Sequence, residues 1–210
     1  SASQASTRKS RALSELTFQV ARRTRPTIAG DDRPTIRHME ATCWSDYLCP
    51  WCYVGQDRSA QIASYGIAVV HRPYELHPEL PAAGLAIRPD GRMAPTFARI
   101  AVECDEIGLP FRAPERMPNT RRALETAEWV RLHHPGAAER LHAALFHAHF
   151  AAGLAIDDPD VIDQLVADAG APMTEVRAAI DGRAGAELVD ASMSDARAAG
   201  VSSTPTWVLD

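Results

Sequence analysis

Hydrophobic residues recur along this chain with two different spacings, and each spacing predicts a different kind of element. A short apolar run over residues 41–44 is followed by a helical stretch over about 49–65, and a second strand candidate covers 67–76. This second run contains the β-branched residues Ile67 and Val69, which strands favour. Because a strand, a crossover helix and another strand form a parallel unit, we expect the domain to begin with β-α-β.

The middle of the chain, about 92–183, has the spacing of helices. Asp158 suits a helix N-cap, Pro159 suits the first helical position, and Gly170 follows the expected last one. Two apolar faces repeat at i, i+3, i+4 and i+7, namely Phe97, Ile100, Ala101 and Cys104, and Leu141, Ala144, Leu145 and Ala148. The pattern therefore predicts an all-helical subdomain.

A last helix over about 185–199 precedes a turn and a strand that begins near Thr206. The expected order is β-α-β, then helices, then β. We therefore expect one α/β domain assembled from residues 39–91 and 184–210, with 92–183 inserted as a helical subdomain.

The composition is typical of a globular domain and argues against two other classes, membrane-spanning and nucleic-acid-binding proteins. A chain of 210 residues suits one domain with an insertion, and 46% apolar and 23% charged residues are ordinary globular values. No run of about 18 uncharged apolar residues predicts a membrane span. A net charge of −5 and a pI near 5.9 argue against nucleic acid as a partner, because phosphate binding needs clustered Lys and Arg.

Residues 1–38 form a separate leader that holds eight Lys or Arg and three acids. Its Ser-, Thr- and Arg-rich composition predicts disorder and is similar to that of an organelle transit peptide. The simpler interpretation is that Met39 is the natural start and that the leader is upstream or added sequence. It lacks the apolar segment of a secretory signal, so we expect a reducing, cytoplasmic location.

Two of the four cysteines form the turn Cys49-Pro50-Trp51-Cys52 at the start of the first expected helix. The unpaired amide N–H groups and the dipole at a helix start favour an anion, so the pKa of Cys49 should be lowered. Cys52 follows almost one turn later on the same face. We therefore expect Cys49 to be the nucleophile and Cys52 the resolving thiol of thiol–disulfide exchange.

Four segments, in this order, carry a family resemblance. They are residues 44–55 (WSDYLCPWCYVG), 72–78 (RPYELHP), 145–150 (LFHAHF) and 200–206 (GVSSTPT). Together they resemble the FrnE-like branch of the DsbA family, whose members are thioredoxin-fold dithiol–disulfide oxidoreductases and isomerases with a helical insertion.

The resemblance implies a thioredoxin-like fold with a large all-helical insertion over residues 39–210. It also implies that Pro205 follows a cis peptide bond and that Thr204 faces the Cys49 sulfur, where an extended substrate pairs with the backbone. The family pattern continues with a further strand and a closing helix, which we expect this chain to lack. The strand at Thr206 would then be an edge or pair with a second copy in a homodimer.

Pro50 and Trp51 separate the two thiols and tune their reduction potential, which in this fold runs from about −270 mV to about −120 mV. Neither residue carries a charge that would stabilise the Cys49 thiolate. We therefore expect an intermediate potential, less oxidising than that of DsbA.

The remaining reactive side chains are weaker candidates. Asp46 is a candidate proton relay for Cys52, although an Asp at a strand end is more often a turn residue. Cys43 and Cys104 lie on a strand and a helix face that are expected to be buried, where free cysteine is a common core residue.

Three histidines, His142, His147 and His149, resemble a metal cluster until their spacing is considered. Spacings of five and two do not align imidazoles on one helix face as i, i+4 does, and no paired acid completes a site. We expect surface histidines and no metal site.

The sequence thus predicts a thiol–disulfide oxidoreductase or isomerase acting on protein or small-molecule thiols and disulfides, reset by a cellular reductant or oxidant. No cofactor beyond the Cys49–Cys52 pair is expected, and glutathione is a candidate co-substrate. Two alternatives stay open. One is a glutathione-dependent enzyme similar to kappa-class transferases and hydroxychromene-carboxylate isomerases, which typically have Ser at the first active position. The other is an inactive, truncated fragment.

Overall fold

Three strands form the central sheet. In the computed structural model, which describes residues 39–209, β1 (Glu40–Ser45) lies between β2 (Ala68–Pro73) and β5 (Thr206–Leu209). β1 runs parallel to β2 and antiparallel to β5. The predicted leader lies outside the described residues.

Helix α2 (Pro50–Ser64) connects β1 to β2 and gives the predicted parallel β-α-β unit. Cys49 is its N-cap residue and has extended backbone angles, while Pro50 occupies the first helical position, where its missing N–H costs nothing. The strand predicted over 67–76 ends earlier, at Pro73. The reason is tertiary, because the N–H of Leu76 is donated to the Asp46 carboxylate instead of to a neighbouring strand.

The two faces of the sheet are covered by different helices. Successive side chains of β1 point to opposite faces, so Cys43 and Trp44 identify which helix lies where. Cys43 is hydrogen-bonded by Ser59 of α2, whereas Trp44 packs against Ala196 of α8 (Ala184–Ala198). The sheet is therefore the middle layer between α2 and α8. A long excursion of the chain separates β2 from α8.

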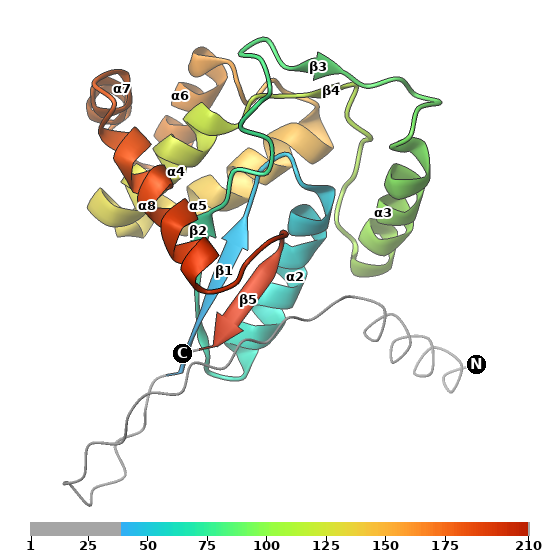
Figure 1. Ribbon diagram of the computed structural model, residues 1–210, viewed down its shortest axis with the longest axis horizontal. Helices are drawn as coiled ribbons and strands as arrows, with labels where there is room; N and C mark the ends of the chain where they lie inside the picture. Colours follow the sequence, from blue (N-terminus) through green and yellow to red (C-terminus); the bar gives the residue numbers. More distant parts are fainter. Residues whose placement is uncertain (1–38, 210) are drawn as a thin grey trace, which may run out of the picture.

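That excursion is helical, as predicted, with one short two-stranded addition. Its elements are β3 (Leu85–Ala86), α3 (Ala94–Ile107), β4 (Arg116–Met117), α4 (Arg121–His133), α5 (Pro135–His147), the π-helical segment η1 (Ala148–Ala152), α6 (Pro159–Asp168) and α7 (Met173–Asp181). Figure 1 shows α4 to α8 gathered on one side of the small sheet, with α3 beyond α2 on the other side. The antiparallel pair β3–β4 was not predicted, since each strand has only two residues.

Local signals set the helix boundaries. α3 ends where Gly108 takes the left-handed conformation, with φ 68°, which glycine adopts without steric cost. α6 begins after Asp158, whose side chain accepts a hydrogen bond from the N–H of Asp160. No helix within residues 39–209 is long and apolar enough to cross a membrane.

One large apolar core joins the two parts of the molecule. It includes Cys52 and Tyr53 from α2 together with Leu141, Leu145 and Phe146 from α5. The helix that carries the cysteine pair is therefore packed directly against the helical insertion, and the position of the Cys-Pro-Trp-Cys turn depends on both.

Candidate active site

The two cysteines of the Cys-Pro-Trp-Cys turn lie at the start of α2, beside the loop that leads into β5. The Cys49 thiol donates a hydrogen bond to the backbone carbonyl of Thr204, with a sulfur-to-oxygen distance of 3.6 Å. The peptide bond between Thr204 and Pro205 is cis. Cys49 and Cys52 are both free thiols and are 5% and 3% exposed. The fold thus brings together residues that are 155 positions apart.

The environment of Cys49 favours its thiolate. A hydrogen bond from the Cys52 side chain lowers the pKa of Cys49, and the Thr204 side chain and the Cys52 backbone N–H lower it further. Burial and the negative charge of Asp46 act in the opposite direction, but the net pKa is lowered. Hydrogen bonds to a charged form stabilise that form, so Cys49 is the more nucleophilic thiol of the pair.

Cys52 has the opposite character. Burial raises its pKa well above the ordinary value, and its hydrogen bond to Cys49 and the Cys49 charge raise it further. The Thr204 side chain and the backbone of Asp46 offset only part of this increase. The pKa of Cys52 is therefore shifted upward and that of Cys49 downward, so Cys49 is the thiol of the pair that loses its proton more readily.

Asp46 is fully buried and connects the Cys-Pro-Trp-Cys turn to two other segments. Its Oδ1 accepts hydrogen bonds from the Thr120 hydroxyl at 2.7 Å and from the Leu48 N–H at 3.3 Å. Its Oδ2 accepts one from the Leu76 N–H at 2.8 Å. Burial, partly offset by these bonds, raises the pKa of Asp46 to about 6. The carboxylate therefore positions the turn and can also change its charge near neutral pH. Sequence reasoning did not find Thr120, which lies 74 positions away.

Trp51 has a cationic neighbour that the turn itself does not contain. The guanidinium of Arg99, on α3, lies 5.1 Å from the centre of the Trp51 ring. This distance is within the range of a cation–π contact. The sequence argument considered only the residues between the two cysteines, so it could not include a charge that α3 supplies.

The prediction of three surface histidines is wrong for two of them. His149 is only 5% exposed, and His142 lies against Tyr47 and accepts or donates a hydrogen bond of 3.0 Å with its hydroxyl. His147 is exposed as predicted. His149 lies in the π-helical segment, where the wider turn changes the side-chain directions that α-helical spacing gives. His142 lies in α5 itself and is covered because that helix packs its ring against Tyr47 and His71. Within residues 39–209 no group of three or more His, Cys, Asp or Glu could hold a metal ion.

The other two cysteines are core residues. Burial raises the pKa of Cys43 to about 12 and that of Cys104 to about 11, and both are free thiols. Protonated, buried thiols are poor nucleophiles, so neither competes with Cys49.

Comparison with known proteins agrees with this architecture. The family model described as DSBA-like thioredoxin domain matches residues 41–210. A solved structure described as a probable DsbA oxidoreductase from Streptomyces coelicolor is 26% identical, has a TM-score of 0.74, and is similar over 82% of this chain and 81% of that one.

More distant structures share the fold. The cytosolic disulfide reductase DsbM from Pseudomonas aeruginosa is 18% identical, with a TM-score of 0.58 over 80% of this chain and 83% of its own. A 2-hydroxychromene-2-carboxylate isomerase is 19% identical, with a TM-score of 0.63 over 80% and 84%. No curated protein matches this sequence. The thioredoxin-like fold with a helical insertion is therefore confirmed, and the chain belongs to the DsbA-like thioredoxin domain family.

Proposed function

We propose that this protein is a thiol–disulfide oxidoreductase or isomerase of the FrnE-like branch that acts in the cytoplasm through Cys49 and Cys52. One observation carries the proposal. The thiol at the start of α2 has a lowered pKa, whereas its neighbour three residues later has a raised one. This pairing supports a nucleophile and a resolving thiol in a single turn.

The proposed reaction exchanges electrons between the two thiols and a substrate disulfide. The Cys49 thiolate attacks one sulfur of a substrate disulfide, forms a mixed disulfide and expels the other sulfur as a thiolate. Cys52 then loses its proton and attacks the Cys49 sulfur. The substrate leaves as a dithiol, and Cys49 and Cys52 are left as a disulfide. The reverse sequence oxidises a substrate dithiol, and a cellular thiol or disulfide, with glutathione as a candidate, resets the pair.

The neighbours of the two thiols have proposed roles in this cycle. The backbone carbonyl of Thr204 accepts a hydrogen bond from the Cys49 thiol. The backbone at Thr204 would also pair with an extended substrate next to Pro205. Asp46 is the proposed relay for the Cys52 proton, because its pKa of about 6 lies close to physiological pH. Pro50 and Trp51 would set the potential together with the Arg99 cation above the Trp51 ring.

A redox titration in glutathione buffers tests the proposal, with the fluorescence of Trp51 as the signal. We expect a single two-electron transition at an intermediate potential. Cys49→Ser and Cys52→Ser should each abolish it, and Cys52→Ser should accumulate a mixed disulfide at Cys49. Cys104→Ser, which removes a core thiol, is the matched control and should retain the transition. A folded protein without any two-electron transition would overturn the proposal.

The rate of alkylation by iodoacetamide gives an independent test of the nucleophile. In the reduced wild-type protein, the alkylation rate of Cys49 should have its pH midpoint below about 8.5, the ordinary pKa of cysteine. Cys52→Ala removes the hydrogen bond that lowers the pKa of Cys49 most and should raise this midpoint. A wild-type midpoint at or above about 8.5 would mean that the surroundings of Cys49 do not stabilise its thiolate.

A glutathione-dependent transferase or isomerase is the second candidate, and its support is the likeness to the isomerase fold and to DsbM with glutathione. Conjugation of glutathione to an electrophile separates the two functions. Activity that survives Cys52→Ser would favour this class, because a resolving thiol has no role in conjugation. An inactive fragment would show neither a redox transition nor conjugation.

The proposed homodimer concerns the outer edge of the sheet. In the described part of the chain β5 has β1 on one side only, so its other edge could pair with a second copy. Size-exclusion chromatography with light scattering should give twice the mass of 22.8 kDa, and a monomer at micromolar concentration would contradict this proposal.

A further inference from the structure

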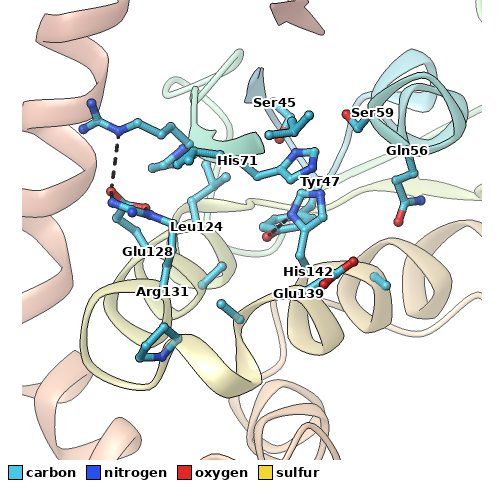
Figure 2. Close-up of a pocket in the computed structure, with 18 of the residues that line it drawn as sticks. Ser45, Tyr47, Gln56, Ser59, His71, Leu124, Glu128, Arg131, Glu139 and His142 are labelled. Atoms are coloured by element: carbon cyan, nitrogen blue, oxygen red, sulfur yellow. Dashed lines mark hydrogen bonds and ion pairs between the residues drawn. The ribbon is translucent and has the colours of Figure 1, made fainter. Parts of the chain in front are cut away.

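A cavity of about 580 Å³ lies between the thioredoxin-like part and the helical insertion (Figure 2). Its walls are one face each of α2, α4 and α5 together with the edge strand β2. Cys49, Cys52, Thr204 and Pro205 do not line it. Cavities that bind small molecules typically have volumes of about 300–1,000 Å³, and this one lies within that range.

Small side chains keep this space open. Each of the three helices presents alanines to the cavity, among them Ala60 and Ala63 of α2, Ala127 of α4, and Ala138 and Ala143 of α5. Protein interiors are otherwise filled to the density of organic crystals, with few voids larger than a water molecule. The cavity opens to solvent on one side, where Ala60, Ala63 and Ala143 are exposed, and its wall is mostly apolar.

Two imidazoles line the mostly apolar cavity. The rings of His71, on β2, and His142, on α5, lie with their centres 4.1 Å apart and an interplanar angle of 31°. In Figure 2 the two rings lie side by side next to Tyr47. The Tyr47 hydroxyl occupies Nδ1 of His142. Nε2 of His142 and Nδ1 of His71 are buried and have no hydrogen-bond partner.

Unpaired buried nitrogens of this kind need an explanation, since about nine in ten buried polar groups in proteins are paired. Each neutral imidazole has one donor and one acceptor nitrogen. Burial lowers the pKa of His71 to about 4 and that of His142 well below its ordinary value. Both rings are therefore neutral near pH 7 and can each give or accept one hydrogen bond.

The charged residues on the cavity wall are engaged with one another. Arg131 donates two hydrogen bonds, of 2.7 and 2.8 Å, to the carboxylate of Glu128. Arg72 lies 3.7 Å from the same carboxylate and 2.7 Å from that of Asp195. Glu139 is exposed at the rim. A charged ligand in the apolar interior would lose its hydration without gaining a buried counter-ion, which is costly, whereas a neutral hydroxyl needs only one partner.

We propose that this cavity binds a small uncharged molecule with an apolar, flat body and one hydroxyl group, which pairs with Nε2 of His142. The body lies between the alanine faces, and the His71 and His142 rings, which are tilted relative to each other, form the polar end of the site. The site is separate from the cysteine pair, so this proposal does not depend on the proposed redox function.

Three naphthalene probes of matched size test the ligand class. 2-Naphthol is neutral, 2-naphthoate is anionic and 2-naphthylmethylamine is cationic near pH 7. We expect one-to-one, saturable binding of 2-naphthol to the full chain by isothermal titration calorimetry, at least tenfold tighter than binding of either charged probe. Equal binding of all three would mean that the imidazoles do not select the ligand and would overturn the proposal, as would the absence of 2-naphthol binding.

Substitutions test the location. His142→Phe keeps a ring but removes the nitrogens and should weaken 2-naphthol about tenfold, which is about 1.4 kcal/mol. Ala127→Leu adds three carbon atoms to the wall of the cavity and should weaken binding about tenfold, whereas Ala178→Leu, at an exposed position of α7, should bind like the wild type. Unchanged binding by Ala127→Leu would overturn the proposal.

Imidazole ¹⁵N NMR of the wild-type protein gives a readout that needs no variant. 2-Naphthol should shift the ring-nitrogen signals of His142 and His71 and leave those of the exposed His147 in place. Binding that moves none of the His71 and His142 signals would place the probe elsewhere and overturn the proposal, even if a variant failed to fold.

Discussion

Replacing Asp46 with asparagine should change how the stability of this protein depends on pH. Burial raises the pKa of this carboxyl from 3.8 to about 6 in the folded state. A raised folded-state pKa means that the native protein binds the proton more tightly than the unfolded chain. The group therefore contributes stability that is fully present below about pH 3.8 and is lost as the pH rises through 6. The shift of about two units corresponds to about 3 kcal/mol.

Asparagine removes the titration and keeps most of the geometry. Its oxygen can still accept from Thr120 and Leu48, but its NH₂ group would face the Leu76 N–H, so two donors would meet. That mismatch should cost about 1–3 kcal/mol at every pH. The free energy of unfolding of Asp46→Asn, relative to wild type, should therefore rise by about 3 kcal/mol between about pH 4 and pH 8.

Urea unfolding at five pH values, followed by tryptophan fluorescence, measures this difference. Taking the difference between two proteins cancels the groups that both share. Asp105→Asn, at an exposed position of α3, is the matched control and should give a constant difference across the range. A constant difference for Asp46→Asn, or one that falls with rising pH, would refute the argument that burial dominates at this carboxyl.

Three further substitutions have expected effects on the free energy of unfolding. Gly55→Leu should destabilise the protein by about 1–3 kcal/mol and slow thiol exchange, because even a Cβ there would lie 3.3 Å from Pro205 and from Trp207; unfolding and insulin-reduction rates measure both effects, and a neutral result would contradict the close packing of α2 on this loop. The free energy of unfolding of His71→Gln, relative to wild type, should rise by about 3 kcal/mol as the pH falls from 6.5 to 4. The reason is that a folded-state pKa of about 4 lets the unfolded wild-type chain bind the proton first. Urea unfolding across this range would show a constant difference between the two proteins if the imidazole were not buried. Asp158→Ala should cost about 1 kcal/mol through loss of the α6 cap, whereas an unchanged unfolding midpoint would mean that the cap contributes nothing.

Local sequence was sufficient for much of the fold. The prediction of α6 depended on Asp158, Pro159 and Gly170, and the structure has the helix over Pro159–Asp168. The left-handed turn at Gly108 ends α3 where the apolar spacing of the sequence stops. These signals work because a cap, a proline and a left-handed glycine act on their own few residues of backbone.

The same reasoning explains what the sequence suggested about the site. The pKa of Cys49 is lowered mainly by a hydrogen bond from Cys52, three residues later at the same helix start, so this feature follows from the spacing of the two cysteines. The roles of Asp46 and of the strand end near Leu76 do not follow from any such spacing. Leu76 leaves the expected strand because its N–H reaches a carboxylate 30 positions earlier.

The tertiary structure alone decided the features that join distant segments. It brought Thr120 to Asp46, Arg99 to Trp51, and His142 to His71. It also left a cavity where alanine faces of three helices meet, although each alanine by itself is an ordinary helix residue. The periodicity of apolar residues shows which face of a helix is buried. It does not show which other helix or strand packs against that face. The placement of two thiols at the start of a helix could therefore be predicted from the sequence, whereas their surroundings depended on how the helical insertion packs against the sheet.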